Sequence, residues 1–549
     1  MPRFRVVALS LALAALAQSQ PLRSLKTVPT PAPPNLSTYV RDPAALLVLG
    51  KALFWDMQAG SDGRTACATC HFHAGADHRP QNQISNPNTP FPTNRVLAQI
   101  EFPLRQLTNP DDRNSPALRD SSHRIGSAGV HRRVYYDITP GRADEQGGDA
   151  LDQPAFSQSN LQVRRVTSRN APSVINAVFH VRNFWDGRAE RIFTHRILIS
   201  RNGILSPEQV QLNDSSLASQ AVGPIMDHLE MSYEGRTWPS LARKLFNLTP
   251  LALQRVAPDD SILGPYSNGR GLNTTYLNLI QSAFQSNLWE GEPAQAETNF
   301  SFFWALAIQA YESTLVSNES AFDRFQEGDP NALSPQQQEG LALFQNAARC
   351  TQCHAGPEFS NAAITAIGNG NGLNGRAFQR TGVRPIQEDP GQSNGAFKSI
   401  GLRNIEFTGP YFHNGGQATL EQVIDFYVRA GDFNPNNNNI RTFNATPVQR
   451  ASLVAFLKSL SDDRVRYERA PFDHPELCVP SGHTESSPGV LRPSANPYYP
   501  TSAEDQWLSI PAVGAAGNLV PLRTFEEMQK GAGADGSRAH AFTEKREIP

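Results

Sequence analysis

The sequence of 549 residues predicts a mainly α protein with long irregular loops, built as two related domains. Several segments combine helical periodicity with recognisable caps, whereas strand signals are few and short. Stretches rich in Gly, Asn and Pro, such as residues 368–375 and 434–439, separate the helical segments. We expect these stretches to be surface loops.

Two helices are predicted in the first three fifths of the chain. One covers residues 42–54, where Asp42 suits the N-cap and Pro43 suits the first helical position. The other covers residues 300–315, where the large apolar side chains recur on one face.

Two more helices are predicted further along the chain. Ser334 suits the N-cap, Pro335 the first helical position, and Gln337 the third helical position. This spacing is a capping-box pattern. The second of these helices covers residues 419–429, with Thr419 as its cap.

A short repeat links the helix at 42–54 to the helix that Ser334 caps. Residues 50–54 read Gly-Lys-Ala-Leu-Phe and residues 340–344 read Gly-Leu-Ala-Leu-Phe, and each stretch precedes a pair of cysteines. This match indicates an internal duplication. We therefore expect an N-terminal domain over residues 42–330 and a C-terminal domain over residues 331–476, preceded by a proline-rich leader (18–41) and followed by a loosely structured tail (477–549).

The first seventeen residues have the features of a signal peptide. Arg3 and Arg5 supply positive charge, residues 6–16 are apolar but too short to span a bilayer, and Ala15 and Ala17 fit a cleavage site. A buried N-terminal helix is the alternative. We expect a soluble protein of the bacterial periplasm, because no other segment is apolar enough to cross a membrane.

The charge balance excludes one class of partner. The formal net charge is −2, so nothing indicates binding to nucleic acid.

Two Cys-x-x-Cys-His motifs carry the chemistry: Cys67 to His71 and Cys350 to His354. In this pattern two thiols (Cys67 and Cys70, Cys350 and Cys353) add to the vinyl groups of a haem, and the adjacent histidine becomes an axial ligand of the iron. Zinc is the main alternative, but paired zinc motifs lie much closer together in a chain than these two. A thioredoxin-like dithiol would need a βαβ context, which is not seen. We therefore expect two cytochrome c-like domains with one covalently bound haem c each. Cys478 is left without a role.

The chain resembles the bacterial di-haem cytochrome c peroxidases and their relative MauG, which oxidises residues of a partner protein. The resemblance covers most of residues 43–470 and is strongest at residues 169–189, 220–231, 311–354 and 381–431. It implies that Trp185 lies between the haems and relays electrons, although a tryptophan more often serves packing. It also implies that Glu230, aided by Gln220, is the acid–base group over the N-terminal haem. One carboxyl can take a proton from peroxide and return it to the leaving oxygen.

The resemblance further implies a Ca²⁺ between the haems. Asn170 would bind it through its side-chain oxygen, and Thr408 and Pro410 through their carbonyls, an all-oxygen set that suits this ion. His413 also falls in a family motif, without a derived role.

The sequence departs from typical peroxidases of this family at three places. Where they have a methionine ligand on the C-terminal haem, this chain has Tyr427, as MauG has a tyrosine; a packed tyrosine beside another ligand is the alternative. No histidine lies between His131 and His180, and Gln162 stands in the region of the removable distal ligand. The segment 188–220 is longer than in short peroxidases. Larger relatives, including the haem-dependent rubber oxygenases, are also similar in size and around residues 54–78.

These observations predict a periplasmic di-haem oxidoreductase that reacts with hydrogen peroxide at the His71 haem. The His354 and Tyr427 haem would share the oxidising equivalents. The electron donor would be a small cytochrome c or a cupredoxin, or the substrate would be a protein, as for MauG. The alternatives are an oxygenase that cleaves an apolar polymer or lipid, which Glu230 disfavours, and a non-catalytic di-haem electron carrier.

Overall fold

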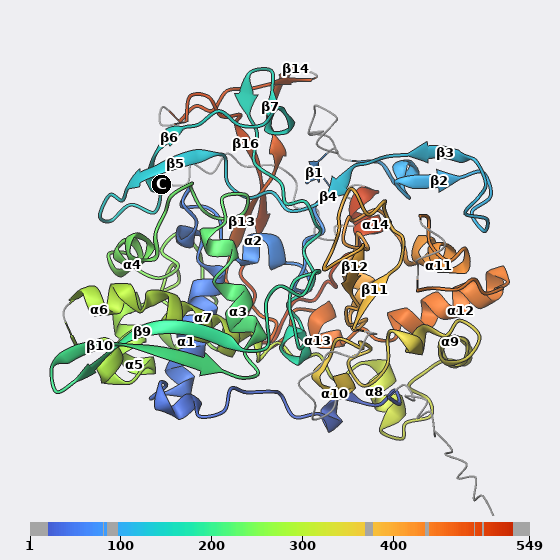
Figure 1. Cartoon of the computed structure of the whole chain (residues 1–549), viewed down its shortest axis with the longest axis horizontal. Coiled ribbons are helices and arrows are strands. Elements are labelled where there is room, and N and C mark those ends of the chain that lie inside the picture. Colours follow the sequence, from blue (N-terminus) through green and yellow to red (C-terminus); the bar gives the residue numbers. More distant parts are fainter. Residues whose placement is uncertain are drawn as a thin grey trace, which may run out of the picture.

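The computed structural model describes residues 20–80, 82–84, 97–291, 293–367, 377–433, 439–487, 489–496 and 499–530. The predicted signal peptide, and most of the two loops expected at 368–375 and 434–439, lie outside these residues. Of the described residues, 30% are in helices and 18% in strands, so the prediction of a mainly α fold is wrong. All the described strands pair as two-stranded antiparallel ladders placed around the helical cores (Figure 1).

The N-terminal core is built on two crossing helices, α1 (Pro43–Trp55) and α7 (Phe300–Glu312). Asp42 caps α1 as expected, because its carboxylate accepts hydrogen bonds from the amides of Ala44 and Ala45. The helices α3 (Ser216–Ala221), α4 (Trp238–Phe246), α5 (Tyr276–Ala283) and α6 (Pro293–Thr298) surround this pair.

A second core lies beside the first and contains α9 (Pro335–Gln345), α11 (Leu420–Val428) and α12 (Pro447–Lys458). Ser334 and Gln337 form the expected capping box of α9, and Thr419 caps α11. The remaining helices are short: α2 (Ala68–His71), α8 (Ala321–Gln326), α10 (Ile364–Ile367), α13 (Asp463–Arg466) and α14 (Phe525–Gln529).

The glycine at the start of the repeat allows close contact between two helices in both cores. A methyl group at Gly50 of α1 would collide with the carbonyl oxygen of Ala307 in α7. A methyl group at Gly340 of α9 would collide in the same way with the carbonyl oxygen of Ser452 in α12. In each domain, therefore, a helix pair crosses backbone to backbone at the first residue of the repeat, which supports a duplicated module.

The longest ladder joins β9 (Phe193–Arg201) to β10 (Ile204–Leu212) and accounts for the extended segment 188–220. Asn202 and Gly203 connect the strands with positive φ angles of 53° and 76°. Asn-Gly is the strongest short signal for a hairpin, because both residues tolerate this conformation. The sequence analysis missed this signal.

The other ladders are shorter. They pair β1 (Gln83–Ile84) with β4 (Arg124–Ile125), β2 (Arg105–Leu107) with β3 (Ala117–Asp120), β5 (Arg133–Asp137) with β6 (Gln146–Asp149), β7 (Ser157–Gln158) with β8 (Leu161–Gln162), β11 (Phe378–Arg380) with β12 (Ala396–Lys398), and β14 (Glu485–Ser487) with β15 (Val490–Leu491). Such short strands, often with only one side chain buried, carry little periodicity that a sequence can reveal.

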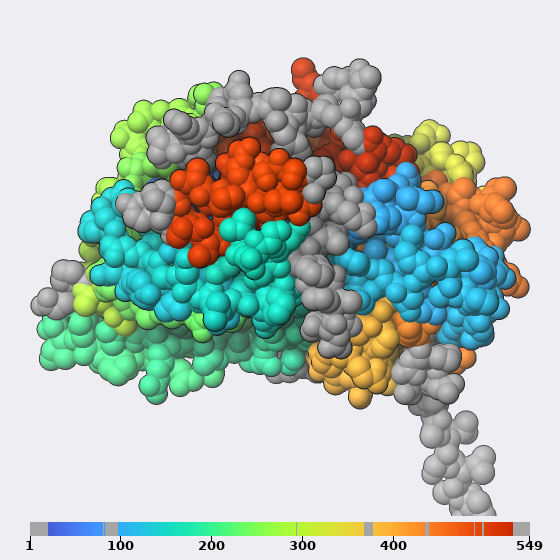
Figure 2. Space-filling view, turned by 90° about the horizontal axis from the view of Figure 1, so that it is seen from above, coloured from blue at the N-terminus to red at the C-terminus, as the bar shows by residue number. Residues whose placement is uncertain are grey.

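The C-terminal segment packs on the N-terminal core. Its strands β13 (Leu477–His483) and β16 (Asp505–Ile510) pair with each other, and Leu477 and Val479 are fully buried in the cluster that contains α1 and α7. Further along, Leu491 and Ala503 pack against residues 156–166. In Figure 2 this orange-red segment lies across the teal residues of the N-terminal domain.

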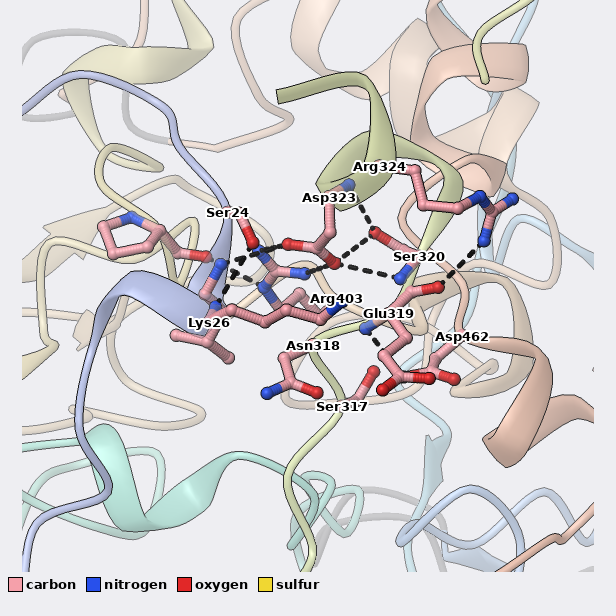
Figure 3. A network of polar contacts seen from close by, with 12 residues as sticks. Ser24, Lys26, Ser317, Asn318, Glu319, Ser320, Asp323, Arg324, Arg403 and Asp462 are labelled. Atoms are coloured by element: carbon pink, nitrogen blue, oxygen red, sulfur yellow. Dashed lines mark hydrogen bonds and ion pairs between the residues drawn. The ribbon is translucent and has the colours of Figure 1, made fainter. Parts of the chain in front are cut away.

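The leader packs on the second core. Leu22 is buried in the C-terminal core, and the amide of Leu25 donates a hydrogen bond of 3.0 Å to Asp323. Asp323 in turn forms a bidentate ion pair with Arg403, at 2.7 and 2.9 Å, where both side chains are buried (Figure 3). Within the described part of the chain, no helix has the length and apolar character needed to cross a membrane.

Candidate di-haem site

The first Cys-x-x-Cys-His motif forms the short helix α2 and the residue before it. Cys67 and Cys70 are half-buried free thiols, not joined in a disulfide. The Nδ1 atom of His71 lies 2.9 Å from the carbonyl oxygen of Gly75. Donation from Nδ1 fixes the imidazole ring and leaves Nε2 for an iron, which is the usual arrangement of an axial histidine.

The second motif has the same arrangement. Cys350 and Cys353 are also half-buried, and Nδ1 of His354 lies 3.0 Å and 3.1 Å from the carbonyl oxygens of Phe359 and Ile400. A cavity of about 230 Å³ is lined by these three motif residues. Paired thiols and a histidine with a free Nε2 are the donors that a covalently attached haem requires, so both sites fit that group.

Tyr427 also lines the cavity of the second motif. It projects from α11, and burial, with smaller contributions from the thiols of Cys353 and Cys350, raises its pKa above the usual value. The structure therefore brings Tyr427 and His354 to one cavity, as the sequence analysis expected for two ligands of one iron.

Glu230 lies near the first motif. Its charge is one of the causes that raise the pKa values of the Cys67 and Cys70 thiols, after their burial. Burial, with a smaller contribution from Asp227, raises the pKa of Glu230 itself to about 7. A carboxyl group in this state can both accept and return a proton at neutral pH.

The backbone around Glu230 is held from two sides. The amide of Val130 donates a hydrogen bond of 3.0 Å to the carbonyl of Glu230, and Gly129 packs so closely that a side chain there would collide with it. Gln220 belongs to α3, which Trp304 of α7 anchors through a hydrogen bond of 3.1 Å to the carbonyl of Ala221. Gln220 lines the cavity of about 230 Å³ at the second motif, called the large cavity below.

Trp185 lies on the wall of the same cavity and is only 8% exposed. Its indole N–H donates a hydrogen bond of 2.7 Å to the carbonyl of Asn170, and its ring stands 6.2 Å from that of His413. His413 is stacked on Phe397 with ring centroids 3.6 Å apart. Trp185 is thus fixed in position and orientation beside the second motif.

The three residues expected to bind Ca²⁺ also line this cavity. The side-chain amide nitrogen of Asn170 donates a hydrogen bond of 3.2 Å to the carbonyl of Ile125, which leaves its Oδ1 atom as the possible ligand. Thr408 and Pro410 follow the short turn Ile405–Phe407.

Gln162 does not face the first motif. It is 9% exposed, its side chain donates to the carbonyl of Ala150 at 2.7 Å, and its backbone pairs with Thr501 and Ala503 of the C-terminal segment.

The sequence analysis missed two buried ionisable residues. Glu312, at the end of α7, is 6% exposed; burial raises its pKa to about 8, and its charge contributes to the raised pKa of the Cys67 thiol. Lys398 lines the large cavity and donates a hydrogen bond of 3.1 Å to the side chain of Asn183, and burial lowers its pKa to about 7. A single Glu or Lys carries no sequence signal of burial, so neither could be predicted.

Comparison with known proteins gives consistent matches. The profile of a family described as di-haem cytochrome c peroxidase matches residues 44–331. The chain is 29% identical over 307 residues to the cytochrome c551 peroxidase of Nitrosomonas europaea and 28% identical over 305 residues to that of Pseudomonas aeruginosa, covering 54% and 55% of this chain. It is 34% identical over 188 residues, or 34% of this chain, to the methylamine utilization protein MauG of Methylorubrum extorquens. The matches span 66%, 66% and 49% of the lengths of these relatives.

Proposed function

Because this chain belongs to the di-haem cytochrome c peroxidase family, we propose that it is a c-type oxidoreductase that carries two haems and reacts with hydrogen peroxide. When bound, the haem irons supply the redox chemistry. Cys67, Cys70 and His71 would hold the first haem, and Cys350, Cys353, His354 and Tyr427 would hold the second.

The observation that carries the proposal is a protonatable carboxyl group beside the first attachment motif. Glu230 has a pKa of about 7 and lies close enough to Cys67 and Cys70 to influence both thiols. It accepts the proton that peroxide loses and returns it to the oxygen that leaves. In this proposal Gln220, which belongs to α3, aids Glu230.

Trp185 couples the two haem sites in this proposal. Its indole lies beside the second motif, and its N–H is held by the carbonyl of Asn170. Asn170 also provides the side-chain oxygen of a Ca²⁺ site that Thr408 and Pro410 complete through their carbonyls. One ion would therefore fix the residue that positions the indole.

The electron donor in this proposal is a small cytochrome c or a cupredoxin in the periplasm, with a protein substrate as the second possibility. Such donors dock through small, weak interfaces. The signal peptide proposed over residues 1–17 would direct export, which covalent haem attachment in the periplasm requires.

The test is to add stoichiometric hydrogen peroxide to the purified di-haem protein as isolated and to follow both haems by absorption and EPR. We expect both haem signals to change without prior reduction, because no histidine lies between His131 and His180, the region where related peroxidases have their removable distal ligand. A non-catalytic electron carrier, in which both irons would be six-coordinate, would give no high-spin EPR signal and no response to peroxide. An oxygenase would instead consume oxygen with an apolar substrate and need no peroxide.

A further inference from the structure

A cluster of three potential metal ligands lies away from both attachment motifs. His131 precedes β5, His483 ends β13 and Asp505 begins β16. One ligand atom from each residue lies within 4.8 Å of the other two. His483 and Asp505 are cross-strand partners, which puts Nδ1 of His483 3.3 Å from Oδ1 of Asp505, and Nε2 of His131 lies 4.0 Å from the same oxygen.

Two polar atoms of this cluster, one on His131 and one on Asp505, make no hydrogen bond within the described residues. His131 is 8% exposed, and its Nε2 has no hydrogen-bond partner among the described residues. The Oδ1 atom of Asp505 is also buried and has no donor in hydrogen-bond geometry within the same residues. A buried polar atom without a partner lowers the stability of the fold by about 1–3 kcal/mol. A ligand bound between the two atoms would remove this cost.

We propose that His131, His483 and Asp505 bind a divalent transition-metal ion of the zinc class, through Nε2, Nδ1 and Oδ1 respectively. Two imidazoles and one carboxylate favour such an ion over Ca²⁺ or Mg²⁺, which prefer oxygen ligands. With bonds of about 2 Å, ligand atoms of a tetrahedral site stand about 3.3 Å apart. The pair of His483 and Asp505 already has this spacing, and His131 has to approach Asp505 by less than 1 Å.

The surroundings supply the charge and the outer contacts of a metal site. Arg164 binds the second oxygen of Asp505 at 2.9 Å and also Asp62 at 2.9 Å, so the two carboxylates and one guanidinium leave one negative charge. This contact orients the ligating carboxylate.

One existing contact has to open when the metal binds. The amide of Arg164 donates to Nε2 of His483 at 3.2 Å, so Nδ1 carries the proton of this imidazole. A metal at Nδ1 requires the other neutral tautomer of His483, with the proton on Nε2, and so breaks the contact with the amide of Arg164. The side chains of His131 and Asp505 are 10% and 11% exposed, which leaves a route for the ion.

The metal would link parts of the chain that are far apart in sequence. It ties the paired strands β13 and β16 of the C-terminal segment to the segment before β5 in the N-terminal domain. We therefore expect the ion to stabilise the folded protein without taking part in the haem chemistry, because a ligand that binds only the folded state raises its stability.

The experiment uses the full di-haem protein, treated with a chelator and then returned to a Ca²⁺-containing buffer. Zn²⁺ is added, the excess is removed by desalting, and zinc and iron are measured by mass spectrometry. The two haem irons serve as the internal standard. We expect one zinc per two irons and a higher melting temperature with zinc than without.

Three variants decide the assignment. His131→Gln removes an atom that has no hydrogen-bond partner, so the variant should fold and keep its haem spectrum but lose the zinc and the zinc-dependent rise in melting temperature. Asp505→Asn should lose them as well. The control is His228→Gln, which changes an exposed histidine outside the cluster and should retain both. Absence of zinc from the unmodified protein, or equal zinc in His131→Gln, would overturn the proposal.

Discussion

At the scale of single residues, the pKa of Glu230 sets the expected pH dependence. Burial raises it to about 7, so the carboxyl is protonated below pH 7 and can accept a proton only above it. We predict that the rate constant for peroxide, measured by stopped-flow absorption, rises with pH through a midpoint near 7. Glu230→Gln should lower this rate constant by about 10²- to 10⁴-fold and remove the pH dependence.

A neighbouring residue provides the matched control. Asp227 contributes to the raised pKa of Glu230, and its Oδ1 accepts a hydrogen bond of 2.6 Å from the amide of Leu229. Asp227→Asn keeps an acceptor but removes the charge, so the midpoint should move to lower pH while the maximal rate is kept. A rate that is the same in Glu230→Gln as in the unmodified protein would exclude the acid–base role.

The side chain at position 427 should set the potential of the second haem. A thioether favours reduced iron, whereas a phenolic oxygen favours oxidised iron. We predict that Tyr427→Met raises the reduction potential of this haem and changes its absorption spectrum in a spectroelectrochemical titration. Tyr411→Phe is the control, because Tyr411 is buried on the wall of the same cavity. If neither variant moves the potential, Tyr427 is not a ligand.

At the scale of elements, one buried ion pair also binds the backbone of the leader. Asp323 at the start of α8 binds Arg403 through two hydrogen bonds and accepts a third from the amide of Leu25. We predict that Asp323→Ala lowers the free energy of unfolding by about 3–5 kcal/mol, because it leaves the buried guanidinium of Arg403 uncompensated. Denaturant titration followed by far-UV circular dichroism measures this loss.

Glu319→Ala is the comparison for that prediction. The side chain of Glu319 is 50% exposed and lies 3.5 Å from Arg464, so its removal should change the free energy of unfolding by less than about 1 kcal/mol. Equal effects of the two substitutions would show that the ion pair of Asp323 does not hold the leader.

At the scale of the whole molecule, the C-terminal segment is part of the N-terminal core. Leu477 is fully buried beside residues of α1 and α7, whereas Leu519 of the same segment is 99% exposed. We predict that Leu477→Ala lowers the free energy of unfolding by about 2–5 kcal/mol, through lost burial and the cavity that remains. Leu519→Ala should have almost no effect, and a comparable loss in both would contradict this packing.

Local patterns in the sequence determined several elements and the nature of the cofactor. The caps at Asp42, Ser334 and Thr419 predicted three helices correctly, because a cap and its helix are neighbours in the chain. Each Cys-x-x-Cys-His motif contains its whole attachment chemistry within five residues, and the family match is consistent with it. The fold class was predicted wrongly, because most of the ladders are short and the Asn202-Gly203 turn of the longest one was missed.

Only the tertiary structure decided which distant residues meet. It brings Glu230 close to Cys67, puts Tyr427 and His354 on one cavity, and buries Glu312 without any local signal. It also brings His131 to the C-terminal strands. Such contacts depend on the path of the whole chain and on which surfaces exclude water, whereas a motif or a cap depends on residues that are adjacent in sequence.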